Sequence, residues 1–387
     1  MGVNTLFKVS AALLLMTAAT SATAEDGVDA NSIVFGQAAA LHGAAGALGS
    51  GMQAGLLAAF KEANDAGGVH GRMLSLTSYD DGYEPDKSIE QVRKLIEVDR
   101  VFALIGPVGT PTSSATLPLA KAAGVPFIGA FTGAGFLRDA SHGNVVNVRA
   151  SYGAETETWI QDLVDGQKMS KIALLYQDDS FGRVGLDGVT AALERRGMKL
   201  VAEATYQRNT VAVKSALLEL RRAEPDAVVM VGAYQPVAEF IKLARSINFN
   251  PTFVNISFVG SNALASELGP HGEGVVISQV VPFPWDKSLP LVSDYHAALA
   301  ASDPDEKPGF VSLEGYMVGR LAVQVLQQTG PDVTREAFLG TVFEKGPFDI
   351  GGVTLSFGPD DNQGMDEVFM TEIQADGSFT PRAMPGS

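Results

Sequence analysis

Short, continuous apolar runs alternate along this chain with longer stretches in which apolar residues recur every three or four positions. The runs at residues 33–38, 101–105 and 125–128 are rich in branched side chains, which is typical of parallel strands buried on both faces. The stretches at residues 50–66 and 85–99 carry apolar residues on one face. They predict amphipathic helices that alternate with the strands.

The same order of elements begins again near residue 171. Apolar runs at residues 171–176, 199–205 and 227–231 alternate with helical patterns at residues 182–196 and around Leu217. Connections of this length suit right-handed crossovers between parallel strands. The pattern therefore predicts an α/β fold with two Rossmann-like domains, each built on a parallel central sheet.

The composition narrows the functional classes. The 387 residues carry a formal net charge of −16, which argues against a nucleic-acid partner. The sequence has no cysteine, which excludes disulfides, thiolate metal sites and a thioether lipid anchor. The chain is also longer than one hydrophobic core normally serves, in agreement with two domains.

The first residues have the form of an export signal. A polar start that ends at Lys8 precedes an apolar run at residues 9–19 and the small residues Ala22 and Ala24. This run is shorter than the roughly 20 residues that span a membrane, and it fits a cleaved leader. We expect residues 1–24 to be a signal peptide and the mature protein to be periplasmic, not membrane-embedded.

Two loops at predicted strand ends hold most of the candidate chemistry. The strands at residues 101–105 and 125–128 both run into segments of glycine, threonine and proline. In open parallel sheets, ligands bind beyond the carboxyl ends of the strands, where hydroxyls and backbone N–H groups can hold a polar or anionic group. The candidate residues are Gly109, Thr110, Thr112, Thr132 and Gly133. Helix capping explains Thr112 equally well.

Several short motifs follow one another in an order that carries a family resemblance. A glycine-rich turn at residues 67–72 precedes a Tyr-Asp-Asp segment at residues 79–81, and further matches extend almost to the C-terminus. These further matches are Pro85, Lys87, Ile105, Gly106, Gly124, Val125, Pro126, Phe181, Gly182, Gly232, Ala233, Tyr234, Ser312, Tyr316, Ala375, Asp376 and Gly377. The succession resembles type I periplasmic solute-binding proteins of ABC importers, the family of the leucine/isoleucine/valine-binding protein.

This resemblance implies two lobes that are joined by three crossing segments and close on a ligand by a hinge motion. It places residues 31–148 and 281–360 in the first lobe, and residues 149–280 and 361–387 in the second. It implies that the protein binds a small molecule and delivers it to an inner-membrane ABC permease. A sensory receptor of the same fold, reporting to a signalling partner, is the alternative.

The resemblance also implies ligand contacts from both lobes. Positions that hold the ligand carboxylate and amine in amino-acid-binding members match Thr110 and the pair Thr132-Gly133. Aromatic contacts of the second lobe match Phe181 and Tyr234. Further aromatic candidates are Phe131, Tyr152 and Phe258. A place in the core is an equally good explanation for Phe131 and Tyr152.

Ser257 departs from the family pattern. It stands where amino-acid-binding members carry a glutamate that pairs with the ligand ammonium. Because a buried ammonium without a carboxylate partner costs several kcal/mol, an amide, an organic acid or an aromatic acid becomes as good a candidate as an amino acid. Asp178 or Asp179 could supply the missing charge, although solvated acids at a helix start are common.

An enzyme is the third possibility. Residues 49–54 satisfy the GxGxxA dinucleotide fingerprint in form, but residues 39–48 separate them from the preceding strand, which the fingerprint should follow directly. The five histidines have no metal-ligand spacing. We therefore expect no enzymatic activity, no cofactor and no metal, and rank an NAD-dependent oxidoreductase last.

Overall fold

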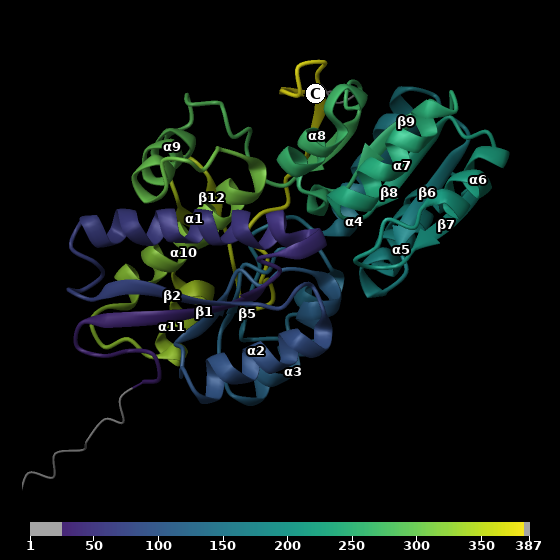
Figure 1. The fold of residues 1–387 in the computed structure, drawn as a ribbon. Helices are drawn as coiled ribbons and strands as arrows, with labels where there is room; N and C mark the ends of the chain where they lie inside the picture. Colours follow the sequence, from purple (N-terminus) through teal and green to yellow (C-terminus); the bar gives the residue numbers. More distant parts are fainter. Residues whose placement is uncertain (1–24, 383–387) are drawn as a thin grey trace, which may run out of the picture.

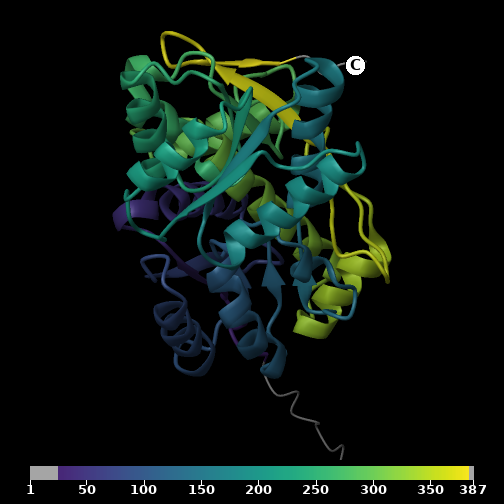
Figure 2. The same cartoon turned by 90° about the vertical axis from the view of Figure 1, so that its right-hand side faces the viewer.

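The computed structural model describes residues 25–382, so the signal peptide expected at residues 1–24 lies outside the described residues. Two sheets organise the chain. In Figure 1 the purple and blue elements around β1 and β2 form one group, and the teal elements from α4 to β9 form another. Figure 2 shows the same two groups one above the other.

The first sheet contains the five N-terminal strands, which are all parallel. Its strand order is β2-β1-β3-β4-β5. The strands are β1 (Ser32–Ala39), β2 (Met73–Asp80), β3 (Ala103–Ile105), β4 (Phe127–Ile128) and β5 (Val145–Val146). The helices of this half are α1 (Gly46–Asp65), α2 (Pro85–Glu97), α3 (Thr110–Ala122), α9 (Pro290–Ser302), α10 (Phe310–Thr329) and α11 (Arg335–Lys345).

The second sheet has the order β14-β13-β10-β9-β8-β6-β7. Five of its strands are parallel, and the two C-terminal strands are antiparallel additions at one edge. The strands are β6 (Ile172–Gln177), β7 (Ala202–Tyr206), β8 (Ala227–Val231), β9 (Thr252–Asn255), β10 (Val276–Gln279), β13 (Phe369–Ile373) and β14 (Phe379–Pro381). The helices are α4 (Tyr152–Ile160), α5 (Ser180–Glu194), α6 (Lys214–Arg222), α7 (Tyr234–Ser246) and α8 (Ser261–Leu268).

The chain passes between these two halves three times, through residues 147–151, 280–289 and 356–368. The expected α/β architecture of two parallel sheets is thereby confirmed. The exact lobe boundaries remain a prediction. Within residues 25–382, no helix has both the length and the apolar character needed to cross a membrane.

One helix begins earlier than the sequence pattern predicted: α1 begins at Gly46, ahead of the expected start at residue 50. Helix α3 begins at Thr110, because Pro111 fits the first helical turn, where its missing N–H costs nothing. The short strand β12 (Thr354–Leu355) pairs with β11 (Phe348–Asp349) as a separate hairpin.

Glycines let α1 pack very closely on its neighbours. A Cβ atom at Gly55 would lie 2.0 Å from the carbonyl oxygen of Ser312 in α10, and one at Gly315 would lie 2.3 Å from the carbonyl oxygen of Met52. Gly49 is equally close to the backbone of Ala40, directly after β1, and a Cβ at Gly51 would lie 2.9 Å from the side chain of Val311 in α10. The two glycines that mimic a dinucleotide fingerprint therefore serve the packing of α1.

We predict that Gly55→Ala will destabilise the protein by about 1–3 kcal/mol or more, because the new methyl group meets backbone that cannot move aside. Urea denaturation measures the change. Gly340→Ala in α11 is the matched control: nothing lies within 4 Å of its added Cβ, so helix propensity should make it neutral or stabilising. Equal effects of the two substitutions would contradict this account of the α1–α10 contact.

Candidate functional site

The carboxyl ends of both parallel sheets meet in the middle of the molecule. The loops after β3 and β4 come from the first sheet, and those after β6, β8 and β9 come from the second. Rings from the two sides are in contact there: Phe131 after β4 lies 5.4 Å from Phe258 after β9, measured between ring centroids. The sequence-predicted residues thus come from segments far apart in the chain.

Five buried rings form what we call the aromatic cluster: Tyr83, Phe131, Tyr152, Phe181 and Phe258. Phe258 is its centre, with ring centroids 4.6 Å from Phe181 and 5.8 Å from Tyr83. Tyr152 lies 5.5 Å from Phe181. Four of these residues were predicted from the sequence as candidate ligand contacts, and Tyr83 was not.

Two hydroxyls line one side of this cluster. The Oγ1 atoms of Thr110 and Thr132 lie 2.7 Å apart and share a hydrogen bond, and both side chains are buried. Thr132 Oγ1 also accepts a hydrogen bond from the backbone N–H of Ala134 at 3.2 Å. The carbonyl oxygen of Gly133 accepts a hydrogen bond from the backbone N–H of Tyr152 at 2.7 Å. Thr110, Thr132 and Gly133 are therefore brought together with Tyr152.

Thr112 and Gly109 have structural roles at the start of α3. The Thr112 hydroxyl donates to the carbonyl oxygens of Val108 and Gly109, as a residue in a helical first turn does. Gly109 has a φ of +104°, and a Cβ there would lie 2.2 Å from the ring of Tyr83. Thr112 is therefore not the helix cap, since α3 begins after Gly109 without a side-chain cap, and its hydroxyl is used by backbone carbonyls. Gly109 makes room for Tyr83.

Tyr234 and the aspartates lie at the edge of this region. The Tyr234 hydroxyl accepts a hydrogen bond from the backbone N–H of Ala47 at 3.4 Å, across the two halves. Asp178 pairs with Arg183 on the surface. Asp179 caps α5 through the N–H of Phe181 and also binds Arg208. Both aspartates are thus already engaged.

Ser257 lies beside acidic groups that the sequence did not reveal. Its backbone N–H and its hydroxyl donate to Glu155 at 2.9 and 2.8 Å. The Ser278 hydroxyl donates to the same carboxylate. Arg149 donates to the Ser257 hydroxyl, and its Nε lies 3.4 Å from Glu314. We call Arg138, Arg149, Glu155 and Glu314 the charge cluster.

Burial and neighbouring charges both shift the pKa values in this cluster. Burial, partly offset by Arg149, raises the pKa of the Glu314 carboxyl to about 7. Burial lowers the pKa of Arg138 to about 10, with the charge of Arg149 acting in the same direction. For Arg149 burial also opposes the charge, but attraction to Glu314, Tyr152 and Glu155 outweighs it and raises the pKa. Arg149 is therefore positively charged at neutral pH.

Further polar contacts join the two halves on one side of the aromatic cluster. Arg208, after β7, donates to Glu84 at 2.9 Å, and Asn209 donates to Glu84 at 2.7 Å and to the carbonyl oxygen of Gly82 at 3.0 Å. Gln177 donates to the Tyr83 hydroxyl at 3.3 Å. The conformation is one in which the two sheet edges are closed against each other.

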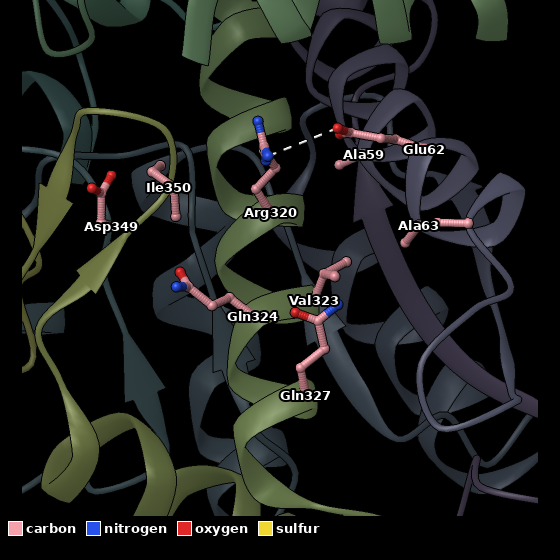
Figure 3. Close-up of a pocket in the computed structure, with 10 residues that line it drawn as sticks. Ala59, Glu62, Ala63, Arg320, Val323, Gln324, Gln327, Asp349 and Ile350 are labelled. Carbon is pink, nitrogen blue, oxygen red and sulfur yellow. Dashed lines mark ion pairs between the residues drawn. The ribbon is translucent and has the colours of Figure 1, made fainter. Parts of the chain in front are cut away.

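Prominent hollows lie away from these residues. One of about 270 Å³ lies between α1 and α10, where Arg320 pairs with Glu62 at 3.8 Å (Figure 3). Another of about 770 Å³ is lined by Phe283, Trp285 and Phe379. Neither has a lining residue from the aromatic cluster, whose rings pack on one another. A solute that binds between the sheet edges must enter when those edges separate.

Comparisons with known proteins place this geometry in a family. The family model described as "Periplasmic binding protein" matches residues 32–378. A Leu/Ile/Val-binding protein homolog 7 from Brucella abortus is 26% identical over 216 residues, which cover 54% of this chain and 54% of that protein. The sequence match thus spans about half the length of this curated relative.

Solved structures match over more of the chain. A possible leucine/isoleucine/valine-binding protein from Rhodopirellula baltica is 38% identical with a TM-score of 0.87, covering 94% of this chain and 98% of that one. A branched chain amino acid ABC transporter protein from Thermus thermophilus with bound valine has a TM-score of 0.83 at 17% identity, covering 92% of this chain and 96% of that one. The second likeness shows the fold alone. Family and fold are those of solute-binding proteins, not of enzymes.

We predict that Glu314 makes the free energy of unfolding depend on pH. Its carboxyl titrates near 4.5 in the unfolded chain and has a pKa of about 7 in the folded protein, where it faces Arg149, Glu155 and Arg138. Between these pH values the folded state holds a proton that the unfolded state has released, so this group makes the free energy of unfolding fall as pH rises. Glu314→Gln removes the titration.

Urea denaturation of both proteins from pH 4.5 to 8 tests the prediction. The unfolding free energy of the wild type minus that of Glu314→Gln should decrease as pH rises to about 7 and then level off. Taking the difference removes the contribution of the other carboxylates. A difference that stays constant or increases with pH would show that the folded-state pKa is not raised.

Proposed function

We propose that this chain, which belongs to the periplasmic binding protein family, captures a small polar or carboxylate-bearing solute between its two sheets and delivers it to an inner-membrane ABC permease. The observation that supports the proposal most is the meeting of strand-end loops from both sheets around one aromatic cluster. A solute held there contacts both halves at once. Such a solute favours the closed arrangement that a permease recognises.

The chemistry of the facing loops fits a solute with a polar head and an apolar body. Thr110 and Thr132 supply hydroxyls from the first half, and Phe181, Tyr234, Ser257 and Phe258 come from the second. Aromatic rings cover apolar surface, while a few placed hydroxyls orient a ligand. Amino acids, amides and organic or aromatic acids all satisfy this description.

Family membership implies an extracytoplasmic location. We propose further that residues 1–24 are removed as a signal peptide during export and that the mature protein begins at Glu25. The capture of solute and its transfer to the permease then take place in the periplasm.

A thermal-shift screen of refolded protein tests the function directly. Residues 25–387 are unfolded, freed of any bound solute and refolded, and then mixed with amino acids, amides, short carboxylates and aromatic acids. A ligand at a hundred times its dissociation constant adds about 2.7 kcal/mol to stability. A selective shift by one chemical class supports the proposal. The absence of any saturable shift across the whole panel would contradict it.

We predict that Thr132→Val will weaken binding of the solute found in that screen by about tenfold or more, because a buried hydroxyl that holds a polar group is lost. Isothermal titration calorimetry measures the affinity. Thr116→Val is the control: this buried hydroxyl donates within α3 to the carbonyl oxygen of Thr112 at 2.9 Å, so its loss affects stability only. Unchanged affinity in a folded Thr132→Val would remove Thr132 from the site.

A further inference from the structure

Arg149 lies where three sequence-predicted site residues meet. It belongs to the first segment that crosses between the sheets, and its side chain is 1% exposed. Its guanidinium carbon lies 4.7 Å from the ring centroid of Phe131 and 5.9 Å from that of Tyr152. One of its nitrogens, Nη2, donates to Ser257. The side chain therefore reaches the candidate ligand site from the hinge side.

Arg149 Nη1 and the Tyr152 hydroxyl are buried and have no hydrogen-bond partner among residues 25–382. Arg149 Nε also makes no hydrogen bond, but it lies 3.4 Å from Glu314, at ion-pair distance. Leaving a buried donor unpaired is destabilising, and more so when the group is charged. Burial raises the pKa of Tyr152 to about 12, so its hydroxyl keeps its proton and can donate at neutral pH. Both groups are donors, which is the complement of an anion.

The acidic side chains nearby are already used. Glu155 accepts hydrogen bonds from Ser257 and Ser278, and Glu314 lies at ion-pair distance from Arg149. Asp179 is held by Arg208, Gln177 and the start of α5. An ammonium brought into this region would compete with these partners, and it would also face the positive charge of Arg149.

The body of the ligand is constrained by the rings. Phe131 and Tyr152 lie next to the Arg149 guanidinium, and Phe181 and Phe258 pack on these two rings. Flat apolar groups pack on such rings in offset or edge-on arrangements. In this closed form the four rings pack on one another, so a ligand that places an anion at Arg149 inserts its remaining atoms among them after the sheet edges have separated.

We propose that Arg149 Nη1 and the Tyr152 hydroxyl form an anion-binding subsite, and that the ligand is a carboxylate with a flat apolar body and no ammonium group. This inference rests on the proposed solute-binding function and narrows its substrate class. In the closed form Arg149 lies beside residues of both halves. Its attraction to a bound anion therefore stabilises the closed form. Thr132, beside Tyr152, supplies a further hydroxyl at this end of the ligand.

Calorimetry with paired probes tests the proposal. Benzoate, 4-hydroxybenzoate, phenylacetate and cinnamate are each compared with the corresponding amide, and L-phenylalanine and L-leucine serve as amino-acid probes. At least one carboxylate should bind about tenfold or more tightly than its amide, as expected for a hydrogen bond to a charged group. The amino acids should bind more weakly than that carboxylate.

Tyr152→Phe is the decisive variant, because it keeps the ring against Phe181 and removes only the hydroxyl, whose polar neighbours include Thr132. We expect it to fold as well as the wild type, to bind the carboxylate about tenfold or more weakly, and to lose much of the preference over the amide. Tyr295→Phe is the matched control. That buried hydroxyl bonds to Ser312 at 2.6 Å, so its removal should lower stability and leave binding unchanged.

The outcomes separate this inference from the proposed function. Preferred binding of an amino acid, equal binding of acid and amide, or an unaltered preference in Tyr152→Phe would each overturn the anion subsite, while solute binding itself would stand. A failure of every solute class in the thermal-shift screen would instead overturn the proposed function together with the inference.

Discussion

The buried positive charge of Arg149 constrains the arrangement of the rest of the structure. A guanidinium removed from water is tolerated only with close partners, and removing one partner of a buried ion pair typically costs 3–5 kcal/mol. Its neighbours Glu155, Ser257 and Glu314 come from α4, the loop after β9 and α10. One side chain on a crossing segment thus ties together helices and loops that belong to different sheets, and the aromatic cluster is built against this anchor.

Strand order and periodicity predicted where part of the candidate site lies. Thr110 and Thr132 follow strands whose ends could be read from apolar runs, and parallel sheets gather such ends at one edge. Phe181 was matched through the family resemblance, and the strand before Phe258, β9, was not predicted. The apolar runs did not predict that the carboxyl edges of the two sheets face each other. That expectation came from the family resemblance, which the match over residues 32–378 confirms.

The charge cluster could not have been predicted in the same way. Glu155 lies 102 positions from Ser257 in sequence, and its partners are chosen by the tertiary fold. In the sequence it looks like an ordinary acid in the first turn of a helix, which is a favourable solvated position. Tyr83 was missed because nothing in its neighbourhood signals that its φ of +61° turns the ring toward the second half. The small clue was Gly109, whose lack of a side chain leaves room for that ring.

The contacts that hold the sheet edges together are individually weak, and this matters for how a solute can act. The side chains of Arg208 and Glu84 are 22% and 40% exposed, so their ion pair contributes at most about 1 kcal/mol. Without a ligand, such ion pairs and the packing of the rings stabilise the closed form. The unpaired buried donors of Arg149 and Tyr152 destabilise it. A solute shifts the balance only by the difference in its affinity for the open and closed forms. That difference comes from contact groups contributed by both halves. In the open form each half alone offers the solute only part of these contacts.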